Sequence, residues 1–156
     1  MTLNEVQDKI VEEFSLYDDW LDKYNLLIDM GKDLPAINPH FKIKDFLIEG
    51  CQSKVWLHPE FSDERISFTA DSDAIITKGI VGLLIRVFSG RTPDEIIAAD
   101  LYFIDKIGLR QNLSPTRSNG LLSMVRQIKL YAMAYKATGN RQPASGNSQD
   151  SPPGRG

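Results

Sequence analysis

The residue with the greatest capacity for chemistry is Cys51, the only cysteine among the 156 residues of the chain. A thiolate is a strong nucleophile, whereas a buried thiol behaves as a small apolar group, so the surroundings decide its role. Cys51 follows Gly50 and lies between two apolar runs, 46–48 and 55–57. This pattern predicts a turn between two strands, in which Gly50 permits a backbone conformation or close approach that a larger residue would hinder.

A single cysteine limits the metal chemistry open to the chain. One thiol cannot form an internal disulfide, and it cannot supply a multi-thiolate zinc or iron–sulfur site. The two histidines, His40 and His58, have no carboxylate or thiol at metal-ligand spacing, so we expect no metal site. A Cys–His nucleophilic pair in a free-standing hydrolase or transferase is an alternative, although the sequence marks neither an orienting third group nor an oxyanion site.

Composition and charge exclude several classes of function. The chain is 42% hydrophobic and 25% charged, which suits one compact domain with one core. Its formal net charge of -3 argues against nucleic acid as the main partner, because phosphate binding usually needs a basic face. No apolar run approaches the roughly 20 residues of a membrane span, and the first residues lack the pattern of a signal peptide. We therefore expect a cytoplasmic protein that binds neither nucleic acid nor membrane.

Two helices are predicted before the cysteine. Thr2 and Glu5 fit a capping box, and apolar residues then recur at helical spacing. Asp18 or Asp19 is expected to cap a second helix, and Gly31 is expected to end it, because helices often end on a residue in the left-handed conformation. This pattern indicates a helical hairpin that packs on the rest of the chain.

Three strands and further helices complete the predicted fold. Strands are predicted over 45–48, 54–58 and 65–70, with turns at 50–53 and 59–64. The second and third segments alternate with a period of two, which is typical of an antiparallel sheet with one covered face. Helices are expected from near residue 74 to Gly90, after Thr92, and after Ser114, and the first of these has apolar residues on nearly all sides. The fold class is therefore α+β, a small three-stranded antiparallel sheet packed against helices.

The composition changes near the end of the chain. From Thr138 onward the sequence is rich in Gly, Pro, Ser, Asn and Gln, and it has too little apolar surface to offset the entropy of ordering. We predict one domain over residues 1–137 and a disordered tail over 138–156.

Several polar residues near the cysteine have two interpretations. Gln52 and Ser53 either support the loop and its partner or simply favour a turn. Asp71 and Asp73 either cap the following helix or form an acidic lip that contacts a partner. Arg117 falls in the first turn of the last helix, where the helix dipole disfavours a cation. That position indicates a partner contact or support for a thiolate, and the alternative is a solvated surface arginine.

Four blocks of sequence resemble the SufE family of sulfur-acceptor proteins. The first is the cysteine segment Gly50-Cys51-Gln52-Ser53-Lys54-Val55-Trp56-Leu57. The others follow in the expected order: Ala70-Asp71-Ser72-Asp73-Ala74, Thr77-Lys78-Gly79-Ile80, and Leu113-Ser114-Pro115-Thr116-Arg117-Ser118-Asn119-Gly120. The resemblance extends to about Thr138, and the long tail departs from the family's usual short end.

The resemblance implies a fold shared with IscU-like iron–sulfur scaffolds and a function in sulfur transfer. Family members take sulfur from a pyridoxal-phosphate cysteine desulfurase of the SufS type, hold it as a persulfide, and pass it to a SufB-containing assembly scaffold. They also accelerate the desulfurase. By this resemblance Cys51 carries the persulfide. The residue types at Gly50, Gln52 and Ser53 make them the candidates for loop support, and a carrier of this kind needs no bound cofactor.

The apolar residues on both sides of Cys51 are expected to shelter the thiol. We expect Cys51 to be partly covered in the free protein and to move outward when the desulfurase docks. We expect a carrier and activator rather than an enzyme, acting as a monomer or weak homodimer. A cluster scaffold is a further alternative, but one cysteine would coordinate a cluster only with ligands from elsewhere.

Overall fold

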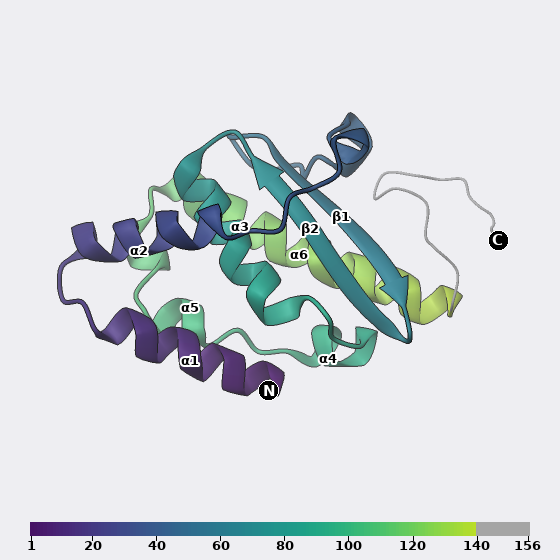
Figure 1. The fold of residues 1–156 in the computed structure, drawn as a ribbon, viewed down its shortest axis with the longest axis horizontal. Coiled ribbons are helices and arrows are strands. Elements are labelled where there is room, and N and C mark those ends of the chain that lie inside the picture. The colour runs from purple at the N-terminus through teal and green to yellow at the C-terminus, as the bar shows by residue number, and fades with distance from the viewer. Residues whose placement is uncertain (140–156) are drawn as a thin grey trace.

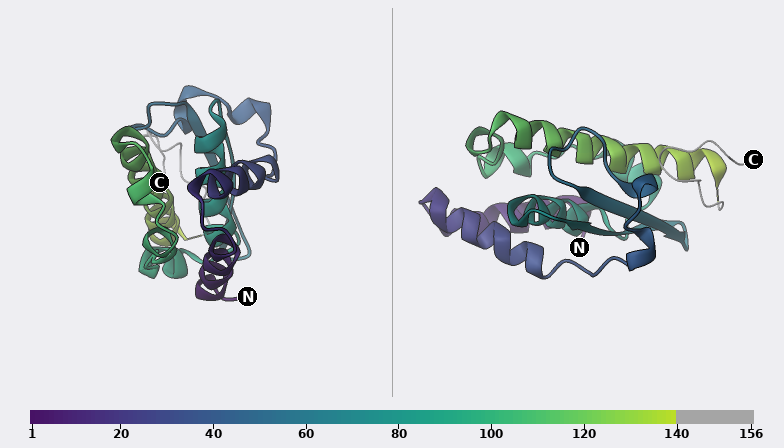
Figure 2. Two further views of the ribbon diagram at one scale, coloured as in Figure 1. Left: turned by 90° about the vertical axis from the view of Figure 1, so that its left-hand side faces the viewer. Right: turned by 90° about the horizontal axis from the view of Figure 1, so that it is seen from above.

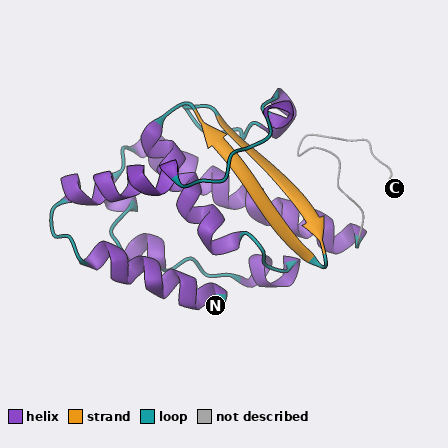
Figure 3. Ribbon diagram, in the orientation of Figure 1, coloured by secondary structure: helices purple, strands orange, loops and turns teal. Residues whose placement is uncertain are grey.

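The fold is α+β and consists mostly of helices, as a computed structural model of the chain shows for residues 1–139, the part described here (Figure 1). The helices are α1 (Leu3–Ser15), α2 (Trp20–Lys32), α3 (Ile75–Phe88), α4 (Pro93–Ala98), α5 (Phe103–Lys106) and α6 (Pro115–Thr138). The strands β1 (Val55–Ser62) and β2 (Arg65–Ser72) form an antiparallel hairpin, which lies between α2 and α3 in the sequence. Figure 3 shows how this hairpin crosses a mainly helical molecule.

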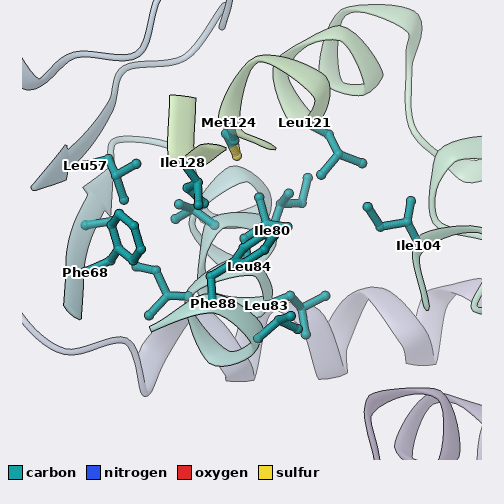
Figure 4. Close-up of a cluster of buried hydrophobic side chains, with 14 of the residues drawn as sticks. Leu57, Phe68, Ile80, Leu83, Leu84, Phe88, Ile104, Leu121, Met124 and Ile128 are labelled. Atoms are coloured by element: carbon teal, nitrogen blue, oxygen red, sulfur yellow. The ribbon is translucent and has the colours of Figure 1, made fainter. Parts of the chain in front are cut away.

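The central layer contains α3 and the hairpin. Two perpendicular views place α2 on one side of α3 and α6 on the other side (Figure 2). Side chains of α3, both strands and α6 meet in one cluster, which includes Leu84, Phe68 and Ile128 (Figure 4). Each of these three side chains is at most 2% exposed, and the prediction that α3 is the buried centre is confirmed.

Local capping signals place several helix starts where the sequence predicts them. Thr2 and Glu5 form a reciprocal capping box at α1, and Thr92 and Glu95 form another at α4. The Ser114 hydroxyl accepts the Arg117 amide at the start of α6, with Pro115 as the first helical residue. These hydrogen bonds satisfy amides that have no partner within the helix.

Gly31 does not end α2, contrary to the prediction. It lies inside the helix, which continues to Lys32, and it is buried against α3. A Cβ atom at Gly31 would lie 2.9 Å from the backbone nitrogen of Gly79, closer than real contacts allow. The glycine therefore permits two helices to approach closely, a role that depends on a residue 48 positions away in the sequence.

The predicted three-stranded sheet is wrong, because the sheet has two strands in the described residues. Residues Lys44–Phe46 form a 3₁₀ turn instead of a strand. The turn uses the Phe46 and Leu47 amides, which donate to Ile43 and Lys44, so these amides are not available to a strand ladder. Leu47 retains a single bridge to Trp56.

The predicted turn over residues 59–64 is also too long. Strand β1 continues through Pro59 to Ser62, and only Asp63 and Glu64 turn the chain. Both have positive φ, 54° and 65°, as a two-residue turn of type I′ requires. Pro59 is tolerated because, in the described residues, β1 has a strand partner on one side only, and the single bridge to Leu47 lies three residues away at Trp56.

The last helix ends at Thr138, one residue beyond the predicted end of the domain. The rest of the predicted disordered tail, apart from Gly139, lies outside the described residues. Within residues 1–139, no helix combines the length and apolar character that crossing a bilayer demands.

Candidate functional site

Cys51 lies on a loop of residues 49–54, called here the cysteine loop, whose two ends are fixed. The Ile48 amide donates to the Val55 carbonyl at 2.9 Å, which closes the loop at its base. The Lys54 amide donates to Asp73 Oδ1 at 3.0 Å, and the Asp73 amide donates back to the Lys54 carbonyl at 3.3 Å. The loop is therefore anchored to the hairpin, while its tip lies outside the strand ladder.

Gly50 is required in the loop for two reasons. Its φ of +93° lies in the region that favours glycine. A Cβ atom at Gly50 would also collide with Ser123 Oγ and lie 3.2 Å from Ser123 Cβ. The cysteine loop therefore rests directly on α6, which carries Ser123.

The Cys51 thiol is partly buried between the loop and α6. Its Sγ atom lies 3.6 Å from the carbonyl oxygen of Gly120, to which the thiol donates a hydrogen bond. Gly120 is buried, and a Cβ atom there would lie 3.4 Å from Sγ, so a glycine leaves space beside the sulfur. The predicted partial cover of Cys51 in the free protein is confirmed.

The surroundings of Cys51 favour the neutral thiol over the thiolate. Burial raises the pKa of Cys51. The carbonyl of Gly120 is an acceptor, so it pairs with an S–H group and would repel a sulfur anion. In this conformation the thiol is stored in its unreactive form.

A pocket of about 200 Å³ opens beside the sulfur. Its buried wall comes from α3 and α6 and consists of Thr77, Ile80, Gly120 and Met124. Figure 4 shows Ile80 and Met124 pointing toward each other from these two helices. The more exposed lining consists of Cys51, Gln52, Ser53, Ser114 and Arg117. The structure thus brings four of the residues singled out in the sequence, Cys51, Gln52, Ser53 and Arg117, to one pocket.

Asp71 and Asp73 do not line this pocket, and neither caps α3 as the capping interpretation predicted. Ala74 is the N-cap of α3 and provides no side-chain hydrogen bond. Asp73 instead accepts the Lys54 amide and anchors the cysteine loop. Asp71 instead pairs with lysine side chains, so neither carboxylate accepts a backbone amide at the start of α3.

Asp71 is held by two lysines. Its carboxylate lies 2.9 Å from Lys42 Nζ and 3.3 Å from Lys78 Nζ. Although burial opposes ionisation, hydrogen bonds from Lys42, the Ser72 amide and Lys78 lower the pKa of Asp71 overall. The lysines connect residue 71 to the segment before the cysteine loop and to α3.

His58 does not reach the pocket. Its ring stacks on Phe41 with centroids 3.5 Å apart, and Phe46 packs edge-on at 4.8 Å. Burial among these rings lowers the pKa of His58. Of the described residues that line the Cys51 pocket, none is a histidine or a carboxylate. The Cys–His enzyme alternative therefore has no base in place to activate the thiol.

Sequence reasoning missed five lining residues as parts of the site: Thr77, Ile80, Ser114, Gly120 and Met124. The helical spacing gives a partial signal, because 77 and 80, like 120 and 124, share one face of a helix. Which face of α3 meets α6 beneath the cysteine loop depends on tertiary packing, so this signal was not sufficient.

No metal centre is visible in the described part of the chain. Among residues 1–139, no group of three or more His, Cys, Asp or Glu side chains is placed to hold a metal ion. The chemistry that this arrangement offers is therefore that of one thiol, stored on an anchored loop beside a small pocket.

These features define a class of protein, a small α+β domain that carries one sheltered thiol on a loop. Residues 8–132 match the family described as SufE, Fe-S metabolism associated domain. The chain therefore belongs to the SufE family, whose domain is described as associated with Fe–S metabolism.

Curated relatives from plants and bacteria show the same similarity. SufE-like protein 1, chloroplastic/mitochondrial, of Arabidopsis thaliana is 37% identical over 144 residues, which are 92% of this chain and 39% of that protein. This chain thus spans well under half the length of that relative. Uncharacterized SufE-like proteins of Rhizobium etli and Rhizobium meliloti are 42% and 39% identical over 127 residues. These matches cover 78% of this chain and 86% and 91% of the two proteins.

A solved structure supports the fold. The solution structure of a hypothetical protein from Thermus thermophilus superimposes with a TM-score of 0.71 at 17% sequence identity. The match covers 85% of this chain and 96% of the other. At this identity the similarity shows a shared fold.

Proposed function

We propose that this chain is a sulfur acceptor that takes persulfide sulfur onto Cys51 from a PLP-dependent cysteine desulfurase of the SufS type. It stimulates that desulfurase and passes the sulfur to a SufB-containing Fe–S assembly scaffold. Membership of the SufE family supports the class of function. The observation that carries the assignment to a residue is the Cys51 sulfur, stored beside a pocket on an anchored loop.

The transfer is a thiol–persulfide exchange. The Cys51 thiol loses its proton, and the thiolate attacks the outer sulfur of the donor's persulfide. A new S–S bond forms on Cys51 while the donor's S–S bond breaks, and its electron pair leaves with the donor cysteine as a thiolate. That thiolate takes up a proton. The sulfane sulfur changes carrier with no net oxidation or reduction, so the step needs no cofactor on this chain.

The resting conformation must change before this step. The Gly120 carbonyl and the burial of Cys51 both oppose formation of the thiolate. We propose that docking of the desulfurase draws the cysteine loop away from α6 and exposes the thiol. Outward movement removes the acceptor and rehydrates the sulfur, which returns its pKa toward the ordinary value. The hinge is at Gly50, which has the backbone freedom that this movement needs.

The partner contact is proposed to involve Arg117. Its side chain is exposed at the edge of the Cys51 pocket, and it forms no ion pair within residues 1–139. An arginine in this position can bind a carboxylate of the desulfurase in a bidentate manner. Gln52 and Ser53 support the loop, and Asp71 and Asp73 belong to the adjoining surface that the partner would meet.

The remaining parts of the proposal follow from a carrier function. The chain acts as a monomer or weak homodimer, and it needs a partner enzyme for each turnover. We propose a cytoplasmic location, whereas the Arabidopsis relative is named as chloroplastic/mitochondrial. The functional unit is the domain of residues 1–137.

Alanine release by a SufS-type desulfurase, measured with and without this protein, tests the proposal. The wild-type chain should increase the rate, because the acceptor removes sulfur from the desulfurase cysteine. Cys51→Ser should bind but give no sustained increase. Unchanged alanine release with the wild-type chain would contradict the proposed activation.

A further inference from the structure

Thr77 is a buried polar residue in the Cys51 pocket, and its hydroxyl has no partner among residues 1–139. Its side chain is 5% exposed, and it belongs to the pocket wall formed by α3. A threonine in a helix commonly donates a hydrogen bond from its hydroxyl to a backbone carbonyl in the preceding turn, and Thr77 does not.

The contrast with Gln7 shows that this is unusual in the same molecule. Gln7 and Thr77 are the buried polar side chains of the described chain. The Gln7 amide bonds to Asn4 Oδ1, to the Asp100 carbonyl and to the Phe103 amide, so its donors and acceptor are used. A buried hydroxyl without a partner is costly, and native proteins rarely keep one unless a ligand or another function uses it.

The pocket has the size and the chemistry to receive one more sulfur atom beside Cys51. Its volume is about 200 Å³, whereas about 15 Å³ by the same measure is enough for one water molecule, so the somewhat larger sulfur atom fits. The outer sulfur of a persulfide is an acceptor of hydrogen bonds, so it requires a donor. On the buried wall, Ile80, Gly120 and Met124 have no side-chain donor, and Thr77 alone provides an O–H group.

We infer that the Thr77 hydroxyl donates a hydrogen bond to the outer sulfur of the Cys51 persulfide and holds the loaded loop in the pocket. This inference rests on the proposed persulfide at Cys51. The Gly120 carbonyl would thus accept a hydrogen bond from the unloaded thiol, and the Thr77 hydroxyl would donate one to the added sulfur. The hydrogen bond from Thr77 keeps the sulfane sulfur away from cellular thiols until a partner draws the cysteine loop out of the pocket.

The test uses inorganic polysulfide as a sulfur donor that needs no partner protein. The Cys51 thiolate attacks the polysulfide, gains one sulfur, and releases a shorter polysulfide. The full-length wild type, Thr77→Val and Thr77→Ser are loaded, desalted and exposed to dithiothreitol, and intact mass reports how much sulfur stays bound. Valine keeps the shape of threonine without the hydroxyl, whereas serine keeps the hydroxyl.

Thr77→Val should lose its sulfur roughly tenfold faster than wild type, a factor that corresponds to about 1.4 kcal/mol. Thr77→Ser should retain sulfur nearly as well as wild type. A purely structural threonine would instead change the unloaded protein, so the Tm and the alkylation rate of unloaded Cys51 are measured as well. In Thr77→Val the alkylation rate should be unchanged. The Tm should be unchanged or slightly higher, because an unpaired hydroxyl is removed.

Two outcomes would overturn the inference in different ways. If wild type loads and Thr77→Val keeps its sulfur as long, Thr77 does not bind the persulfide, although the proposed function stands. If wild type gains no sulfur from either polysulfide or a desulfurase, the proposed function fails and this inference fails with it. Thr77→Ala, a second variant without the hydroxyl, must lose sulfur as quickly as Thr77→Val.

Discussion

The Cys51 sulfur donates its hydrogen bond to the carbonyl oxygen of Gly120, at 3.6 Å, across 69 residues of sequence. This partner accepts a proton and offers none, so it stabilises the thiol and not the thiolate. A sulfur carrier that meets many thiols and oxidants benefits from this pairing, because the neutral thiol reacts slowly with both. Reactivity would then appear only when a partner moves the cysteine loop.

Alkylation of Cys51 by iodoacetamide should show a raised pKa. The rate in the folded protein should rise with pH around a midpoint above that of the urea-unfolded chain, because burial raises the pKa of Cys51. The measurement is the pH dependence of the alkylation rate in both states. A folded midpoint equal to or below the unfolded one would contradict the storage role of the pocket.

The same pKa shift predicts how stability changes with pH. A thiol with a higher pKa in the folded state binds its proton more tightly there, so folding is favoured while the thiol is protonated. This contribution is complete below the unfolded pKa and is lost as pH rises through the folded pKa. Denaturant unfolding of wild type should therefore lose stability at alkaline pH relative to Cys51→Ala. If stability depends on pH in the same way in the two proteins, the pKa of the Cys51 thiol is not raised by folding.

Gly50→Ala should release the cysteine loop from α6. The added Cβ collides with Ser123, and the φ of +93° is unfavourable for alanine. We expect a loss of about 1 kcal/mol or more in stability and faster alkylation of Cys51. Gly90→Ala is the matched control, since Gly90 has a φ of +83° and a Cβ there meets nothing within 4 Å. Gly90→Ala should lose stability without changing the alkylation rate of Cys51. Equal alkylation rates in the Gly50→Ala and Gly90→Ala variants would contradict the account.

Asp73→Ala should loosen the cysteine loop from the hairpin. It removes the acceptor of the Lys54 amide, a hydrogen bond worth about 1 kcal/mol. We expect faster alkylation of Cys51, whereas Asp73→Asn keeps an acceptor oxygen and should resemble wild type. Measuring desulfurase stimulation by Asp73→Asn separates two roles. Normal stimulation supports a loop anchor, and weakened stimulation shows that the charge itself contacts the partner.

Arg117→Ala should weaken the response of the desulfurase while leaving the fold intact. Its side chain is exposed, so we expect the free energy of unfolding to change by less than about 0.5 kcal/mol. The concentration of this protein needed for half-maximal stimulation should rise several-fold. Titration of a SufS-type desulfurase with wild type and variant checks this, and identical curves would reduce Arg117 to a solvated surface residue.

The sequence predicts best those features that neighbouring residues determine. The caps at Thr2, Thr92 and Ser114 are local hydrogen bonds, and all three are present. Cys51 could be singled out because it is the only thiol and lies within a specific sequence block. Such signals need no knowledge of distant parts of the chain.

Features that depend on distant residues could not be predicted in this way. A glycine such as Gly31 after a helical pattern is typical of a helix end, but its role here is set by its close approach to Gly79 of another helix. The apolar run at 46–48 is typical of a strand, yet local 3₁₀ hydrogen bonds take the Phe46 and Leu47 amides. Thr77 enters the pocket only because α3 and α6 meet beneath the cysteine loop. In each case tertiary packing or a local turn overrides the expected pattern.

The most direct test of the central claim is the intact mass of the protein after incubation with a SufS-type cysteine desulfurase and cysteine. The wild-type chain should gain the mass of one sulfur atom, and dithiothreitol should remove it. Cys51→Ser should gain nothing under the same conditions. If wild type gains no sulfur, or Cys51→Ser gains as much, then Cys51 is not the sulfur acceptor.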